Sequence, residues 1–307
     1  MLEFWNSFGS DWRANCLAWE HLGVMIAPSE GWQARWTANP DLLGDDLYYR
    51  GSGTLPDRPD ELKDRLGVAR IVSVGRDGLV LDAARMIVDT GREGEFDASD
   101  VLDPATVEFQ GRVLLYYSGI GASEDAVGLA ISDDDGETFR KVGQVLVGRA
   151  PEVVVVDGRV MMLAQRLDGE TYRLFLYESE DGETFRQVVE EPVFAPEEGA
   201  WDAKSVVTFR HIGEEDGWHY LLYGGSADHA DEPDFFGLIR SRDLSHWERH
   251  PGNPIFGLGR RGEPDGGAIW FPAVWEAHDG WLMLYEGSEG RYSWSLHSQI
   301  CGAFRVR

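Results

Sequence analysis

The hexapeptide Asp-Gly-Glu-Thr-Phe-Arg occurs twice in the chain, at residues 135–140 and 181–186, so its two copies are 46 residues apart (181 minus 135). Each copy lies between short runs of apolar and β-branched residues. Asp-Gly between two such runs is typical of a hairpin turn, because glycine accepts the positive φ that the turn requires. A period of about 40 to 50 residues is typical of propeller blades, which bury their faces only by packing against neighbouring blades. The repeat therefore predicts a β-propeller.

Further copies of the same unit fill the rest of the chain. In each copy, a strand with a proline or a small residue near its start leads through a turn into a second, aromatic strand, which in most copies ends in Tyr-x-Gly. Five units predict an all-β fold, a five-bladed β-propeller in a single domain over residues 1–307, with residues 1–30 completing a blade or covering one end. The first strands of the five units begin at Asn39, Asp103, Ala150, Ala203 and Phe271.

Other architectures explain the pattern less well. Two β-sandwiches would also bury alternating strands, but they would leave the common spacing unexplained. Helical periodicity is weak throughout the chain, and residues 59–66 are the one segment expected to form a helical turn or two, as an insertion in the first blade.

Composition narrows the partners and the compartment. The chain has 54 acidic and 28 basic residues and a net charge of −26, which argues against nucleic acid and against a membrane as partners. No basic segment leads into an apolar run at the N-terminus, and no window of about 18 apolar residues exists. Two cysteines, Cys16 and Cys301, fit a reducing compartment. We therefore expect a cytoplasmic protein, whose oligomeric state the sequence leaves open.

Three carboxylates are expected at the central channel. The innermost strand of each blade lines this channel, and its alternate residues point into it. Two residues after the five strand starts, on the same strand face, stand Asp41, Ala105, Glu152, Ser205 and Ala273. Asp41, Asp103 and Glu152 thus come from three consecutive blades. One carboxyl could protonate a leaving sugar oxygen, another could activate water, and a third could raise the pKa of the acid. Alternatively, such residues simply cap turns at strand starts.

Further residues are candidates for binding a substrate. Arginines can bind a carboxylate, a phosphate or a sugar hydroxyl. A tryptophan can stack on a sugar ring or lie in the core. Asp202, close to Lys204, can act as an acid or form a surface ion pair. Residues 262–272 contain two acids, Glu263 and Asp265, before the tryptophan. The candidate substrate-binding residues are Asn39, Arg50, Arg149, Arg166, Asp202, Trp270 and Glu286.

No cofactor is expected. The histidines show no metal-ligand spacing, and no phosphate-binding glycine loop, Cys-x-x-Cys pair or nucleophile elbow occurs. The segment 226–234 is acidic enough to hold a structural calcium ion, although it lacks the ligand order of an EF-hand loop.

The units resemble the five-bladed β-propeller glycosidases, namely the arabinofuranosidase and xylosidase family 43, the invertase-like family 32 and the mannoside phosphorylase family 130. The resemblance covers most of the chain from Trp32 onward. It rests on Asp103-Pro104 followed by Val-Leu-Leu-Tyr-Tyr-Ser-Gly, on the segment 132–139 after Gly-Leu-Ala-Ile, and on residues 246–256. It implies a carbohydrate substrate bound in the central channel.

In family 43 the resemblance implies an aspartate base in the first blade, an aspartate that tunes pKa in the second, and a glutamate acid in the third. Carried over by position, these roles fall to Asp41, Asp103 and Glu152. The chain departs from the family in having Asn39 where an Asp-Pro pair begins, and in placing Glu152 after a proline rather than before Gly-Pro. Asn39-Pro40 and Arg50 look more like the mannoside phosphorylases, whose arginines bind phosphate.

Residues 132–139 also match the sialidase Asp-box, a structural turn that says little about chemistry, and five units are fewer than the six blades of a sialidase. The sequence therefore predicts a glycosidase that removes a terminal sugar, such as an arabinofuranoside, from an oligosaccharide by an inverting mechanism. A phosphate-dependent phosphorylase and a sugar-binding propeller without catalysis remain as alternatives.

Overall fold

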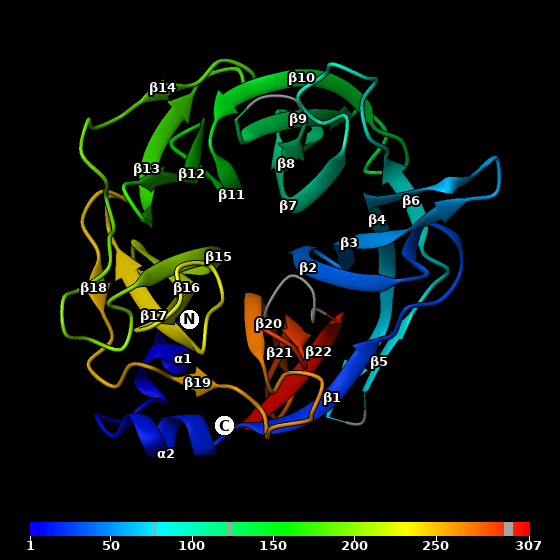
Figure 1. Ribbon diagram of the computed structural model, residues 1–307. Helices are drawn as coiled ribbons and strands as arrows, with labels where there is room; N and C mark the ends of the chain where they lie inside the picture. Colours follow the sequence, from blue (N-terminus) through cyan, green and yellow to red (C-terminus); the bar gives the residue numbers. More distant parts are fainter. Residues whose placement is uncertain (77, 122–123, 292–296) are drawn as a thin grey trace.

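The computed structural model describes residues 1–76, 78–121, 124–291 and 297–307. Its strands form five antiparallel sheets arranged around a central axis (Figure 1). This confirms the predicted all-β, five-bladed propeller. Helical structure in the described residues is limited to α1 (Leu2–Asn6), α2 (Trp12–Leu17) and the 3₁₀ turn η1 (Gly31–Gln33). Among these residues, no helix is long and apolar enough to cross a membrane.

Each blade is a sheet whose strands follow one another from the axis outward. The first holds β2 (Trp36–Leu43), β3 (Asp46–Leu55), β4 (Arg58–Gly75), β5 (Gly78–Leu81) and β6 (Arg85–Val88). The second holds β7 (Asp100–Phe109), β8 (Arg112–Ile120), β9 (Ala126–Ser132) and β10 (Arg140–Val147). The third holds β11 (Arg149–Val156), β12 (Arg159–Asp168), β13 (Thr171–Ser179) and β14 (Arg186–Gln187). The fourth holds β15 (Ser205–Glu215), β16 (Trp218–Ser226), β17 (Phe235–Ser241), β18 (Glu248–Arg249) and β19 (Phe256–Gly257).

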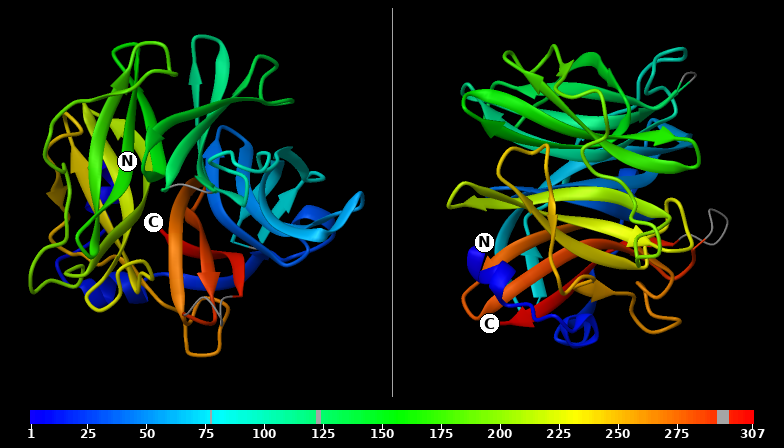
Figure 2. Two further views of the ribbon diagram at one scale, coloured as in Figure 1. Left: turned by 45° about the horizontal axis from the view of Figure 1, so that its top comes forward. Right: turned by 90° about the vertical axis from the view of Figure 1, so that its left-hand side faces the viewer.

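The fifth blade joins the two ends of the chain. It consists of β20 (Ala268–Ala277), β21 (Gly280–Ser288), β22 (Ser298–Val306) and, as its outermost strand, β1 (Glu20–Ile26). β1 pairs antiparallel with β22, and the two strands lie side by side in blue and red in Figures 1 and 2. The N-terminal segment therefore supplies the outermost strand of the fifth blade.

Apolar side chains fill the spaces between neighbouring blades. One buried cluster joins blades two and three through Tyr116, Leu129 and Met162, and another joins blades three and four through Leu176 and Leu221. Burial of a large apolar side chain contributes about 1.5–3 kcal/mol. The blades therefore stabilise one another, which is why a single unit of the repeat would not fold alone.

Both copies of the hexapeptide form the expected turns between the third and fourth strands of a blade. Gly136 and Gly182 have φ values of +83° and +77°, which other residues adopt with strain. Just before the first copy, Asp134 accepts hydrogen bonds from the Thr138 amide (2.8 Å) and hydroxyl (2.6 Å), and the Thr138 bonds lower the pKa of this carboxyl to about 2. In the second copy, Asp181 accepts from the Glu183 and Thr184 amides. The repeated residues thus shape turns.

The helical turns expected at residues 59–66 are wrong. This segment belongs to β4, which pairs with β3 at Arg58 and again from Lys63 to Arg70, with a register irregularity between the two stretches. Good helix formers such as Lys63 and Leu66 follow the strand because they pair with a neighbouring strand, and tertiary pairing overrides weak local propensity.

All five inner strands carry a bulge at the same place. There, a residue other than glycine has a positive φ, and the pairing with the second strand shifts register. The residues at this position are Asn39, Asp103, Ala150, Thr208 and Phe271, with φ values of 46°, 53°, 45°, 55° and 51°. The fourth member corrects the sequence alignment, which placed Ala203 there. The matching residue two positions later is therefore Arg210 rather than Ser205.

Candidate active site

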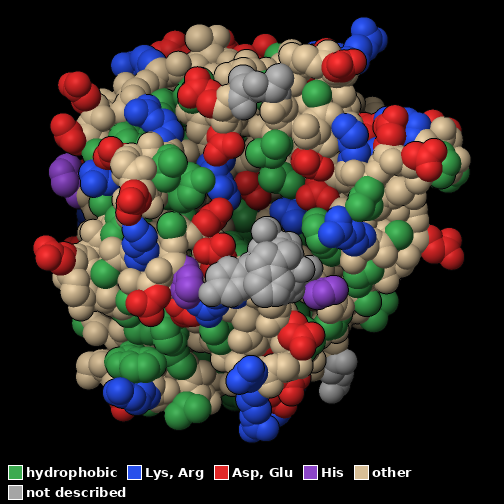
Figure 3. Space-filling model, in the orientation of Figure 1, with side chains coloured by type: hydrophobic (Ala, Val, Ile, Leu, Met, Phe, Trp, Pro, Cys, Tyr) green, Lys and Arg blue, Asp and Glu red, His purple; other side chains and the backbone are tan. Residues whose placement is uncertain are grey.

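The inner strands begin at one end of the channel, which faces the viewer in Figure 3. The surface is hollowed near its centre, and acidic and basic side chains gather around the hollow. We call this end the channel mouth and define it by the five bulge residues together with the residues of the second strands that lie beside them. The latter are Arg50, Ser118, Gln165, Gly224 and Glu286.

Two buried carboxyls lie close together at the channel mouth. Asp103 and Glu286 are 3% and 5% exposed, and they are near enough to influence each other electrostatically. Glu286 accepts hydrogen bonds from the Asn39 amide nitrogen (2.8 Å) and the Ser298 hydroxyl (2.6 Å). Burial raises the pKa of Glu286, the Arg50 guanidinium opposes this rise, and Asp103 adds to it. Glu286 is therefore a carboxyl that keeps its proton more readily than an exposed glutamate does.

The two arginines at the mouth already have carboxylate partners. Arg50 Nε lies 3.2 Å from Asp64 Oδ2. Arg149 binds Asp231 with two nitrogens, at 2.9 and 3.3 Å, and donates to the Tyr172 hydroxyl at 2.9 Å. Both guanidinium groups also interact electrostatically with Asp103. The mouth thus presents a carboxylate flanked by two cations, each of which is largely neutralised from its other side.

Several buried polar atoms at the mouth lack a hydrogen-bond partner among the described residues. They are Asn39 Oδ1, Arg50 Nε, Thr208 Oγ1 and both amide atoms of Gln165; Arg50 Nε lies near Asp64 as an ion pair without hydrogen-bond geometry. Buried polar groups are normally paired, so unpaired ones at a channel mouth are available to an ordered water or to a ligand hydroxyl. Gln165, which pairs with Arg149 across β11 and β12, was not among the residues predicted from the sequence. Gln165 occupies the same position in the second strand of its blade as Arg50 and Glu286 do in theirs, so this position could have identified it. However, the second strand of its unit ends in Ala-Gln-Arg instead of Tyr-x-Gly.

Below the mouth, one arginine holds four blades together. Arg210 is 2% exposed and donates from Nη1 to Glu152 Oε2 (2.9 Å), from Nη2 to the Pro104 carbonyl (2.8 Å) and from Nε to the Pro40 carbonyl (3.1 Å). Its Nε also lies 3.8 Å from Asp41 Oδ1. A single guanidinium therefore contacts the inner strands of blades one, two and three from blade four.

The remaining oxygens of both carboxylates are also occupied. Asp41 Oδ2 accepts from the Thr106 amide (2.8 Å) and hydroxyl (2.6 Å), and Glu152 Oε1 accepts from the His211 amide (2.9 Å). Burial raises the pKa of both carboxyls, and Arg210 opposes the rise. The predicted trio thus lies at two levels, with Asp103 at the mouth and Asp41 and Glu152 two residues further along their strands. We call Asp41, Glu152 and Arg210 the axial ion cluster.

Asp202 lies inside a blade. It is completely buried, and its Oδ2 accepts from the Tyr223 hydroxyl (2.9 Å) and from Arg249 (3.1 Å). Two other blades repeat this arrangement of an aspartate with a tyrosine of the second strand and a cationic or imidazole side chain. These groups are Asp97 with Tyr117 and Lys141, and Asp265 with Tyr285 and His21. Because the arrangement is repeated, we assign Asp202 a structural role, in which it links side chains from different strands of its blade.

Replacing Asp202 with alanine should therefore lower stability and leave sugar turnover unchanged. The variant would leave Tyr223 and Arg249 without their shared acceptor, at a cost of about 1–3 kcal/mol in the free energy of unfolding. Urea denaturation and steady-state kinetics would measure the two effects. Unchanged stability with lost turnover would return Asp202 to the list of substrate-binding residues.

Two further candidates lie apart from the acids of the mouth. Arg166 follows Gln165 on the opposite face of β12, where it donates to the Tyr177 hydroxyl (3.1 Å) and its guanidinium lies 4.3 Å from the Phe175 ring centre. Trp270 is 9% exposed and packs in an apolar cluster with Ala150 and Phe271 at the edge of the mouth. Its indole nitrogen donates to the Asp231 carbonyl (2.6 Å). The structure thus brings Asn39, Arg50, Asp103, Arg149 and Glu286 together, with Trp270 at their edge and Arg166 outside.

The acidic segment 226–234 is already supplied with cations. Asp231 pairs with Arg149, and Asp234 pairs with Arg291 (2.5 Å) while it accepts from the Ser226 hydroxyl (2.5 Å). In the parts of the chain that the structure describes, no three His, Cys, Asp or Glu side chains are arranged to hold a metal ion.

Comparison with solved structures shows the same fold in proteins of distant sequence. A protein named only as a glycoside hydrolase shares 16% identity at a TM-score of 0.69, over 92% of this chain and 90% of that one. A β-1,2-mannobiose phosphorylase from Listeria innocua, solved with β-1,2-mannobiose, shares 13% sequence identity at a TM-score of 0.64. The match covers 94% of this chain and 91% of that one. A family 117 glycoside hydrolase from the marine bacterium Zobellia galactanivorans shares 12% sequence identity at a TM-score of 0.62. The match covers 93% of this chain and 89% of that one.

No model of a known protein family matches the chain, and no curated protein matches its sequence. The structural similarity extends over nine-tenths of each partner. The chain therefore has the fold of the five-bladed propeller glycoside hydrolases, as the sequence resemblance implies. At these identities the comparison establishes the fold, and activity has to be argued from the site.

Proposed function

We propose that this protein cleaves a glycosidic bond at the channel mouth, with Asp103 and Glu286 as its catalytic carboxyls. The observation that carries the proposal is the contrast between two neighbouring acids. Glu286 is buried with a raised pKa, whereas Asp103 interacts electrostatically with the guanidinium groups of both Arg50 and Arg149. Carboxyls whose environments differ in this way suit an acid and a base.

In the proposed reaction Glu286 donates its proton to the leaving sugar oxygen. Asp103 acts as the base and takes a proton from the water that attacks the anomeric carbon. The side chains of Asn39, Gln165 and Thr208, each with an unpaired polar atom, would supply hydrogen bonds to the sugar in this proposal. This assignment keeps Asp103 from the sequence-based trio and replaces Asp41 and Glu152, which lie below the mouth and are bonded to Thr106, Arg210 and the His211 amide.

Water is the favoured acceptor of the sugar. A phosphate dianion requires free cationic groups, and both arginines of the mouth are paired with carboxylates. The nearby carboxyls Asp103, Glu286 and Asp231 would also repel it. We therefore propose hydrolysis. As the sequence predicts, the enzyme would remove a terminal sugar, such as a furanoside, with inversion at the anomeric carbon.

A substrate panel tests the proposal. Aryl furanosides and pyranosides and short oligosaccharides are incubated with the protein, with and without inorganic phosphate, and the anomer released is identified by proton NMR. Release without phosphate, with an inverted anomeric carbon, is the expected result. Turnover that requires phosphate would replace the hydrolase with a phosphorylase, and binding without turnover would leave a sugar-binding propeller.

The Glu286→Gln variant should lose the alkaline limb of the pH profile. A general acid must be protonated, so wild-type activity falls as pH rises through the pKa of Glu286, which lies above its ordinary value of 4.5. Glutamine cannot ionise, and its amide can still bond to Ser298 and Asn39. We expect a loss of about 10²-fold or more in kcat/KM with the limb removed. Reduced activity with the limb in its original place would mean that Glu286 only supports the fold.

A further inference from the structure

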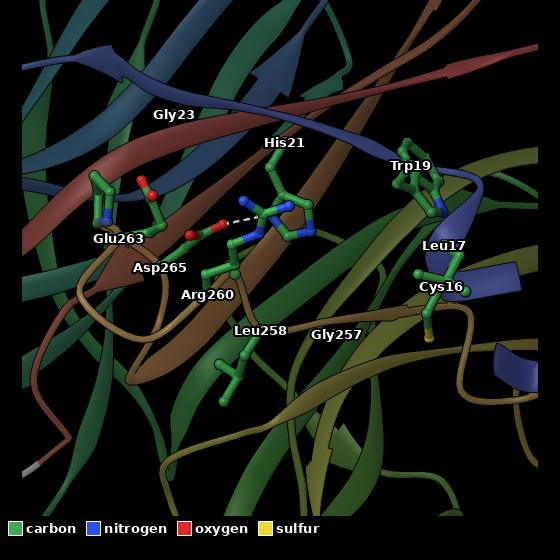
Figure 4. Close-up of a pocket in the computed structure, with 12 residues that line it drawn as sticks. Cys16, Leu17, Trp19, His21, Gly23, Gly257, Leu258, Arg260, Glu263 and Asp265 are labelled. Atoms are coloured by element: carbon green, nitrogen blue, oxygen red, sulfur yellow. Dashed lines mark hydrogen bonds and ion pairs between the residues drawn. The ribbon is translucent and has the colours of Figure 1, made fainter.

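A second cavity lies at the outside of the ring, away from the channel mouth. It has a volume of about 550 Å³ and lies between the end of α2, the start of β1 and the segment 257–265 that joins β19 to β20. Cavities of this size accommodate small ligands. Figure 4 shows Arg260 and His21 on one side of the cavity and Leu17 and Cys16 on the other.

Two opposite charges line the cavity without partners. Arg260 and Glu263 both face it, and neither side chain has a hydrogen bond or ion pair with any described residue. Asp265, in contrast, is engaged by His21 Nδ1 (2.7 Å) and the Tyr285 hydroxyl (2.6 Å). The cavity thus offers one strong donor and one strong acceptor. Such a pair fits groups that both accept and donate, which hydroxyls do and simple anions do not.

Apolar surface complements these polar groups. Leu17 is 85% exposed beside the cavity, and Leu258 and Pro264 line it. The Trp19 side chain also lines the cavity, and its indole nitrogen is buried without a hydrogen-bond partner among the described residues. Its ring packs against Phe8 and Phe256 and adds aromatic surface to the cavity wall. Alternating C–H surface and hydroxyl groups are the chemistry of a sugar.

We propose that this cavity is a second saccharide site that binds a neutral sugar of one or two rings. Arg260 donates to its hydroxyls, Glu263 accepts from them, and Leu17 and Leu258 contact the C–H face of the ring. A carboxylated or phosphorylated sugar is disfavoured because it would place an anion beside Glu263. The site lies outside the proposed catalytic centre and would hold part of a longer carbohydrate or a free sugar while the mouth acts on another.

Titration calorimetry with a panel of neutral disaccharides (maltose, cellobiose, lactose and β-1,2-mannobiose) tests the proposal, in the Asp103→Asn protein so that turnover does not interfere. We expect Arg260→Ala to weaken binding of at least one disaccharide by about tenfold or more, because a hydrogen bond from a charged donor is lost. Glu263→Gln should weaken it as well. Arg261→Ala is the matched control, since Arg261 is an exposed neighbour that does not line the cavity.

The outcomes separate this site from the catalytic one. Arg260→Ala in the otherwise native chain should keep its full turnover of a small aryl glycoside, whereas Asp103→Asn should keep its cavity binding. The proposal is overturned if no disaccharide of the panel binds, if Arg260→Ala and Arg261→Ala bind alike, or if galacturonic acid binds more tightly than the neutral sugars. Failure of the proposed hydrolase would leave the binding result unaffected.

Discussion

Replacing Asp103 with asparagine should reduce glycoside cleavage by about 10²- to 10⁴-fold, the range over which general acid–base groups act. The loss should appear in kcat, because the variant keeps the hydrogen-bonding surface that binds the sugar and loses only the ability to take up a proton. Steady-state kinetics on the best substrate of the panel would measure it.

The fold should tolerate this substitution. Asp103 has a φ of 53°, and asparagine is one of the few residues that adopt this conformation readily. The control is Asp157→Asn, which makes the same change at an exposed turn with a φ of 49°. Both variants should unfold at the wild-type temperature. An Asp103→Asn protein that retained wild-type turnover would remove this residue from the reaction and the proposed mechanism with it.

Replacing Arg210 with methionine should destabilise the protein by about 3–5 kcal/mol, because two buried carboxylates lose their shared counter-charge. For a chain of 307 residues this corresponds to a fall of about 5–8 °C in the melting temperature. Methionine has a similar length, so the loss would come chiefly from charge rather than from a cavity. Differential scanning calorimetry and urea denaturation would measure it.

The loss of stability caused by Arg210→Met should become smaller as pH falls. Without the guanidinium, the pKa of Asp41 and of Glu152 rises further in the folded protein, so the folded state binds more protons than the unfolded one. Stability of the variant must then fall as pH rises, and its deficit must shrink toward acidic pH. Arg186→Met removes an exposed partner of Glu178 and should cost at most about 1 kcal/mol. Equal losses in the two variants would contradict a central role for the axial ion cluster.

The fold could be predicted from the sequence because its repeat is marked by turn residues. Asp-Gly at two hairpins and prolines in four of the five inner strands give the period, and these residues act locally, through the φ that they allow. The fourth inner strand has Thr208-Phe209 where the others have proline, so its bulge has no local signal. The alignment therefore slipped by five residues, to Ala203, and overlooked Arg210.

The site was predicted only in part for a related reason. Asp103 and Glu286 were found because each has a fixed place in the repeat. Which carboxylate meets which cation depends on contacts between different blades, such as Glu152 with Arg210 across 58 residues. No local pattern contains that information. The axial ion cluster and the second cavity, which is formed by residues 16–23 and 257–265, therefore required the three-dimensional structure.

The pairing of β1 with β22 also makes the proposed catalytic centre a late product of folding. The bond from Asn39 to Glu286 spans 247 residues, and the blade that carries Glu286 is complete only when the first strand of the chain joins the last. Contacts so distant in sequence require closure of a long loop and form slowly. During synthesis, four blades can assemble on the ribosome before this step, but they lack the paired acids. The proposed centre should therefore be inactive until the fifth blade has formed and β1 has paired with β22.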